Sequence, residues 1–104
     1  MADYAAEVSR LIECLEHART RPAMYFGEVA VEPAVHFLNG LQFAETFWLG
    51  NLLETRLAVA SERGWPRTAM HPSQHMVERG FTPAEVIDEL LIIEIETLRM
   101  VAPG

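Results

Sequence analysis

Residues 21–27, which have the sequence Arg-Pro-Ala-Met-Tyr-Phe-Gly, decide how the rest of the chain is laid out. One helical pattern runs into this corner, and a longer one starts soon after it. Its proline cannot continue a helix, and its final glycine suits the positive φ of a sharp exit. Burial of Met24, Tyr25 and Phe26 would stabilise the fold by roughly 1.5–3 kcal/mol for each side chain. We therefore expect a packed corner whose three large side chains hold both helices against the last helix.

The segment before this corner has the period of an amphipathic helix from about Tyr4 to Ala18. Its predicted inner face consists of Tyr4, Val8, Leu11, Ile12, Leu15 and Ala18. Asp3 is placed to cap the first turn, where Glu7 suits the helix dipole, and His17 and Arg19 suit the last turn. A first helix that faces the core is therefore expected.

After the corner, Glu32-Pro33 predicts the start of a second helix whose pattern could extend to Arg63, with Gly64 as its stop. A break near Gly50-Asn51 is the alternative, so residues 32–63 form either one helix or two. The predicted inner face consists of Phe37, Leu41, Ala44, Trp48, Leu52 and Val59. Phe43, Phe47, Leu49 and Leu53 lie off this face and predict a second buried surface.

The C-terminal third begins with a connector at Trp65–Thr68 and a short helix predicted over Pro72–Arg79. Thr82 and Glu85 then have the spacing of a capping box, in which each side chain bonds the backbone N–H of the other residue. This signal predicts a last helix from Pro83 to about Val101. The alternation in Ile93-Glu94-Ile95-Glu96 also suits a strand, but the capping box and the length of the element favour a helix.

The last helix is apolar nearly all round, which is typical of a helix at the centre of a core or between a core and a partner chain. We therefore predict an all-α fold, a small bundle of three to four helices that forms one domain over residues 1–104. The apolar last helix, together with Phe43, Phe47 and Leu49, also predicts a homodimer.

Charge and composition exclude several classes of function. The chain of 104 residues has a net charge of −7, so it lacks the basic face that nucleic-acid binding requires. The least charged stretch, from Pro33 to Leu53, is too polar to span a membrane. Cys14 is the only cysteine and flanks the first apolar stripe, where we expect a small buried side chain. Without a disulfide or a signal-peptide pattern, the sequence predicts a cytoplasmic protein.

Residues with catalytic or metal-binding chemistry are few. His71, His75 and Glu78 have a spacing that would place three metal ligands on one helical face, but Pro72 interrupts that face and a fourth ligand is missing. Cys14 and the nearby His17 lack an oxyanion-binding element. We therefore predict no catalytic residue and no cofactor. The alternative hypothesis is a metal-binding protein that uses His71, His75 and Glu78 as ligands.

The corner resembles two groups of known proteins. Arg-Pro-Gly-Met-Tyr-Ile-Gly is a signature near the start of type II topoisomerase ATPase domains, but the following helix here has only Glu45 and no Asp-Asn pair for nucleotide and magnesium. The chain is also too short for that fold, so we reject this assignment. Residues 15–50 also resemble short bacterial proteins with an Arg-Pro-x-Met-Tyr-x-Gly motif, although Ala23 replaces the usual glycine. Some of those proteins look like immunity proteins of toxin systems.

This resemblance and the acidic composition imply a non-enzymatic protein-binding protein, immunity- or antitoxin-like, with an acidic surface that binds a basic protein partner. The candidate partner-binding residues are Arg21, Tyr25, Glu89, Glu94 and Glu96. The alternatives are a structural homo-oligomer or accessory subunit, and the metal-binding protein described above.

Overall fold

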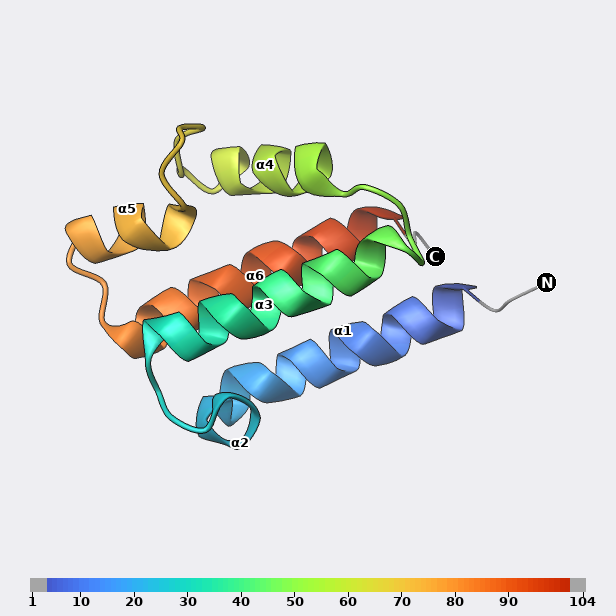
Figure 1. The fold of residues 1–104 in the computed structure, drawn as a ribbon, viewed down its shortest axis with the longest axis horizontal. Helices are drawn as coiled ribbons and strands as arrows, with labels where there is room; N and C mark the ends of the chain where they lie inside the picture. The colour runs from blue at the N-terminus through green and yellow to red at the C-terminus, as the bar shows by residue number, and fades with distance from the viewer. Residues whose placement is uncertain (1–3, 102–104) are drawn as a thin grey trace.

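The computed structural model describes residues 4–101, and within this range the chain is entirely helical and loop (Figure 1). The helices are α1 (Tyr4–Thr20), α2 (Pro22–Phe26), α3 (Val31–Thr46), α4 (Leu53–Glu62), α5 (Pro72–Glu78) and α6 (Pro83–Val101). The predicted all-α class is confirmed for this range. The predicted number of three to four helices is too low, because the corner itself forms a helix and the long pattern after it divides into two.

The last helix, α6, lies at the centre of the bundle and packs against α1, α3, α4 and α5 (Figure 1). Its buried residues are Val86, Ile87, Leu90, Leu91, Ile93, Glu94, Ile95, Thr97 and Leu98. The helices of the same chain thus cover most sides of α6, and its all-round apolarity requires no partner chain. The part of the homodimer prediction that rested on α6 therefore loses its basis.

The capping box at the start of α6 is confirmed. The N–H of Thr82 donates to Oε1 of Glu85 over 2.8 Å, and the N–H of Glu85 donates to Oγ1 of Thr82 over 3.2 Å. These bonds satisfy two donors that a helix start leaves without partners. Residues 91–96 lie in the middle of the helix, so the alternative strand is wrong.

The first helix, α1, extends two residues beyond its predicted end at Ala18. Of the predicted inner face, Val8, Leu15 and Ala18 are buried, and Leu11 and Ile12 pack against the core from partly buried positions. The predicted cap, Asp3, lies outside the described residues. The expectation of a buried Cys14 is wrong, because the flank of the stripe on which it lies faces solvent.

At the corner, α2 makes one short helix between α1 and α3 (Figure 1). Pro22 follows the end of α1, as predicted, but it also opens α2, which was not predicted. Gly27 has the predicted positive φ, at +83°. Only Phe26 of the three large side chains is buried, with its ring edge-on to Phe37 at 5.2 Å. Met24 and Tyr25 are exposed, which contradicts the prediction. Consecutive residues of a helix point about 100° apart, so a single turn cannot direct all three side chains into the core.

The long pattern after the corner is two helices, with Gly50 at φ +88° in the connection between α3 and α4. The buried residues of α3 are Ala34, Leu38 and Glu45. The predicted inner face is confirmed only in part: Leu52 and Val59 are buried and Leu41 and Trp48 pack against the core, but Phe37 and Ala44 are exposed. The predicted second buried surface is wrong, because Phe43, Phe47 and Leu53 are exposed. Relative to the predicted face, α3 is rotated about its axis so that Gln42 and Glu45 face the interior. There they form hydrogen bonds with Glu94 and Arg56.

The predicted connector at residues 65–68 is anchored on the core by Trp65. Its indole N–H donates to Oε2 of Glu89 over 2.9 Å, and its ring lies edge-on to Phe81 at 5.4 Å. The guanidinium of Arg79 lies 4.3 Å from the centre of the indole ring. The loop before α5 is therefore held against α6. Within residues 4–101, no helix has the combined length and apolarity that crossing a bilayer demands.

The contribution of the α6 cap to stability should be measurable. Thr82→Ala should lower the free energy of unfolding by about 1 kcal/mol, because the N–H of Glu85 loses its acceptor. Thr46→Ala is the matched control, since that hydroxyl bonds a carbonyl in the exposed last turn of α3, and it should change stability by less than about 0.5 kcal/mol. Denaturant unfolding followed by circular dichroism measures both, and equal losses would contradict a stabilising cap.

Candidate functional site

The predicted partner-binding residues lie in two separate regions. Arg21 and Tyr25 are exposed at the corner, where the hydroxyl of Tyr25 lies 2.7 Å from Nδ1 of His17. Glu89 and Glu96 lie on α6, and both bind the guanidinium of Arg63. The structure therefore does not bring the candidates together in one acidic surface.

Glu89 is engaged within its own chain. Nε and Nη2 of Arg63 donate to its two carboxylate oxygens over 2.6 Å and 2.8 Å. The bonds from Arg63, and next the bond from Trp65, lower the pKa of Glu89 although partial burial opposes the shift. Glu96 is more open, with its nearest oxygen 3.3 Å from Arg63. A partner would have to break internal ion pairs to use these carboxylates.

Glu94 does not lie on the surface, which corrects its assignment as a partner-binding residue. Only 1% of its side chain is exposed, because α3 and α4 cover that side of α6. The inner position is tolerated since Glu94 accepts hydrogen bonds from Gln42 and Arg56.

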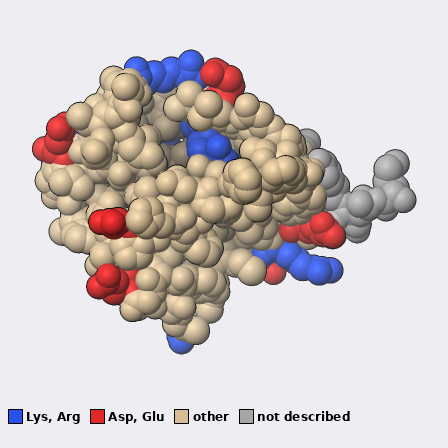
Figure 2. Space-filling model, in the orientation of Figure 1, with Lys and Arg blue, Asp and Glu red and all other residues tan. Residues whose placement is uncertain are grey.

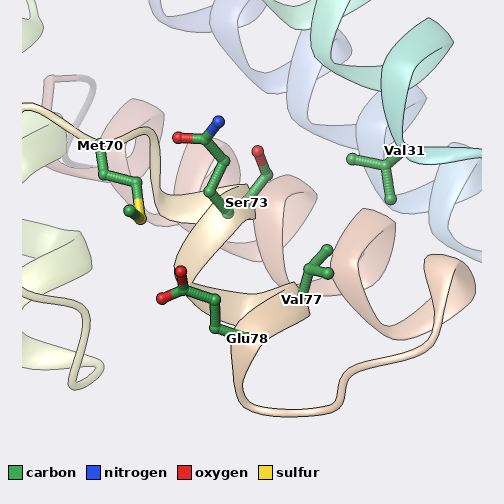
Figure 3. Close-up of a pocket in the computed structure, with 6 residues that line it drawn as sticks. Val31, Met70, Ser73, Val77 and Glu78 are labelled. Atoms are coloured by element: carbon green, nitrogen blue, oxygen red, sulfur yellow. The ribbon is translucent and has the colours of Figure 1, made fainter.

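Of the metal-binding candidates, the structure brings His75 and Glu78 near each other, with Nδ1 of His75 4.0 Å from Oε1 of Glu78, while His71 has other partners. Nδ1 of His71 accepts a hydrogen bond from the N–H of Ser73 and so caps α5, and Nε2 of His75 lies 2.9 Å from Oγ1 of Thr68. Glu78 borders an open depression of about 330 Å³, and Figure 3 shows its side chain pointing away from Val31 across that depression. Among the described residues, no three His, Cys, Asp or Glu side chains come together as metal ligands.

A buried polar cluster formed by Gln42, Glu45, Arg56 and Glu94 joins α3, α4 and α6. Nε and Nη2 of Arg56 donate to Oε1 and Oε2 of Glu94 over 2.8 Å and 3.1 Å. Nη2 also donates to Oε1 of Glu45 over 3.0 Å. Gln42 donates from Nε2 to Oε1 of Glu94 over 2.9 Å. One guanidinium thus holds two carboxyl groups from two other helices.

The two carboxyl groups cannot both ionise without cost, because one arginine balances only one negative charge. Burial, and next the charge of Glu94 and a hydrogen bond with it, raise the pKa of Glu45 to about 8, against the opposing effect of Arg56. Oε2 of Glu45 is buried and receives no hydrogen bond from any described residue. A protonated Glu45 explains this, because the proton makes the carboxyl a donor to Glu94. Near neutral pH the cluster carries no net charge.

A cavity of about 160 Å³ borders this cluster between α3, α4, α6 and the start of α5. Its walls are mainly apolar and include Val35, Leu38, Leu53, Leu57, Ala60, Leu90 and Ile93. Its polar lining residues are Asn39, Gln42, Arg56, His71 and Glu94. Figure 2 shows a hollow below α4 with basic atoms inside it, and Arg56 is the arginine among the lining residues. The cavity is therefore lined by three members of the cluster, Gln42, Arg56 and Glu94.

The arginine of the cluster is more accessible than its two glutamates. The Arg56 side chain is 16% exposed, whereas each glutamate side chain is 1% exposed. His71 is exposed at the mouth, but partial burial of its ring lowers its pKa below 6.5. Because Nδ1 of the neutral ring accepts from Ser73, its proton lies on Nε2. A mainly apolar cavity with a few converging polar groups is the usual architecture of a small-molecule binding site.

A second candidate region is apolar and lies on the surface at the end of α3. The rings of Phe43 and Phe47 pack edge-on at 5.2 Å, yet these residues are 68% and 79% exposed. Neighbouring apolar side chains that are exposed together are a candidate interaction site. We call this pair the Phe43–Phe47 patch.

Sequence reasoning missed the cluster residues Gln42, Glu45 and Arg56. A usable signal was present, because Gln42 and Glu45 interrupt the least charged stretch of the chain. Polar residues within an apolar helix indicate either a solvated face or a buried network. The partner Arg56 lies beyond the break at Gly50, so sequence spacing could not place it.

Titration of Glu45 should make stability depend on pH. Its native pKa of about 8 exceeds the ordinary 4.5, so its contribution to stability is complete below about pH 4.5 and is lost as the pH rises through about 8. Glu45→Gln keeps the neutral form. The stability of this variant relative to the natural chain should therefore rise from pH 5 to 8, by at most about 1.4 kcal/mol per pH unit.

Chemical denaturation at several pH values measures this difference, and Glu62→Gln at an exposed position of α4 is the control. The control should show no such rise. A flat difference for Glu45→Gln would mean that Glu45 is already ionised in the native state at low pH.

Removal of Arg56 should be far more damaging than removal of an exposed arginine. Arg56→Met would leave the Glu94 carboxylate buried without its counter-charge, and we expect a loss of about 3–5 kcal/mol in the free energy of unfolding. Arg67 pairs with Glu54 at the surface, and Arg67→Met should cost less than about 1 kcal/mol. Thermal and denaturant unfolding measure both, and similar losses would contradict the central position of Arg56.

Comparisons with known proteins do not identify either region. No family model, no curated protein and no solved structure matches the chain. Its function therefore has to be inferred from the geometry of the cluster, the cavity and the Phe43–Phe47 patch.

Proposed function

We propose that this protein is a non-enzymatic binding protein that docks a protein partner on the Phe43–Phe47 patch. The observation that supports the proposal is the exposure of two contacting phenylalanine rings at the end of α3. Aromatic residues that stay exposed in the free chain are the anchors that dominate protein interfaces, and each buries roughly 150–250 Å² when covered.

Charge favours a basic partner over a second copy of the chain. The net charge is −7, and the basic residues are mostly committed to internal bonds. Exposed glutamates that form no ion pair with a described residue are Glu7, Glu13, Glu28, Glu32, Glu62 and Glu85. Two copies would bring like charges together, which disfavours association through a small patch, whereas a basic protein would be attracted.

The finer proposal is that the protein is immunity- or antitoxin-like, and that the partner is a basic toxin. It rests on the acidic charge and on the resemblance of the corner to short bacterial proteins. A cytoplasmic location suits this role. A homodimer, in which two patches cover each other, is the alternative that the same exposed rings support.

The test places a photo-crosslinking phenylalanine analogue at Phe47 in the cells that make the protein. The same analogue at Val77, an exposed apolar residue on α5, is the matched control. We expect a basic protein to be captured at Phe47 and not at Val77. The captured protein, once purified, should bind the natural chain and bind Phe43→Ser/Phe47→Ser at least about tenfold more weakly, at unchanged stability.

Other outcomes would contradict the proposal in different ways. Crosslinks between two copies, with sedimentation as a dimer at micromolar concentration, would replace the basic partner by a homodimer. Equal capture at both positions would remove the patch as a docking site. A captured basic protein that is not toxic, or whose toxicity the chain does not relieve, would leave the binding role and remove the immunity-like one.

A further inference from the structure

The cavity between α3, α4 and α6 has the features of a small-molecule site and does not depend on the Phe43–Phe47 patch. Seven of its lining residues are aliphatic or alanine, as described above, and polar groups gather at one part of the wall. An apolar cavity with a few converging polar groups is the usual architecture of a ligand site. The cavity volume of about 160 Å³ is close to that of a cavity known to hold benzene.

The polar wall still has capacity for hydrogen bonds. Arg56 uses Nε and Nη2 for its glutamates, and its Nη1 donates to no described residue. Gln42 donates to Glu94 through Nε2, and its Oε1 accepts from no described residue. A group at this wall would therefore meet the donors of Arg56 and the acceptor of Gln42.

Charge selects the kind of ligand. The positive charge of Arg56 is already balanced by a buried carboxylate 2.8 Å away. An anionic ligand would add a second negative charge beside Glu94, and a cationic ligand would face the guanidinium, so both would be repelled in a poorly solvated site. A neutral ligand with a carbonyl or hydroxyl oxygen avoids both penalties and still accepts a bond from Nη1.

We propose that this cavity binds a small neutral molecule with a ring-sized apolar body and one carbonyl or hydroxyl oxygen, which accepts a hydrogen bond from Arg56. The apolar body lies among the aliphatic residues of α3, α4 and α6, and its oxygen points to the cluster. His71 lies at the mouth with its free Nε2–H, so a hydroxyl group of the ligand can also be held there.

The test uses four matched probes and the complete chain. Cyclohexanone is neutral with an acceptor, benzene is neutral without an oxygen, cyclohexanecarboxylate is an anion and cyclohexylamine is a cation at neutral pH. Titrations are followed by the methyl NMR signals of Leu38, Leu57, Leu90 and Ile93. We expect cyclohexanone to shift these signals and to bind about tenfold more tightly than the other three probes, the value of one hydrogen bond to a charged donor.

Variants of cavity residues test whether the probe binds in the cavity. Val35→Phe should fill the cavity from α3 and abolish the shifts, whereas Val77→Phe, on the other depression, should bind as the natural chain does. Leu57→Phe replaces the first variant if that one fails to fold. Equal affinity for benzene, or tighter binding of either ion, would overturn the ligand class. Absent shifts with the natural chain, or unchanged binding to the filled variant, would overturn the site.

Discussion

The bonds of Arg56 to Glu45 and Glu94 are the constraint on which the arrangement of α3, α4 and α6 depends. A guanidinium on α4 holds a carboxyl group on each of the other two helices, at 3.0 Å and 2.8 Å. If α4 moved away, the Glu94 carboxylate would lose its counter-charge and the carboxyl group of Glu45 would lose a hydrogen-bond donor, which together cost several kcal/mol. The cluster therefore fixes the rotation and the register of three helices at once, which apolar contacts alone specify less sharply.

The same constraint explains the exposed aromatic rings. Residues of a helix are separated by about 100°, so when Gln42 and Glu45 face the interior, positions 43 and 47 point to the opposite side. Gln42 and Glu45 thus continue the inner face that Ala34 and Leu38 begin, and Phe43 and Phe47 are left in solvent. The buried cluster and the Phe43–Phe47 patch are two faces of one helix orientation.

Sequence reasoning succeeded where local rules decide and failed where distant partners decide. The capping box at Thr82, the turn at Gly27 and the apolar face of α1 each depend on residues a few positions apart, and each was predicted. The inner face of α3 was predicted wrongly, because an apolar stripe through Phe37 was the better local pattern. Arg56 lies on α4 and bonds Glu45, so the face of α3 that carries Glu45 turns inward instead of the face that carries Phe37. Glu94 was placed on the surface for the same reason, since its partners lie on α3 and α4.

The cost of this cluster argues that it does more than hold helices together. A buried ion pair is a poor source of stability, since well-packed apolar residues of similar volume often serve as well or better. Here the glutamate side chains are almost wholly enclosed, whereas the Arg56 side chain is 16% exposed and lines the cavity. An arginine whose orientation is fixed by two buried carboxyl groups, and whose Nη1 donates to no described residue, is the preorganised hydrogen-bond donor that the proposed ligand site requires, because its side-chain entropy is already lost before any ligand arrives.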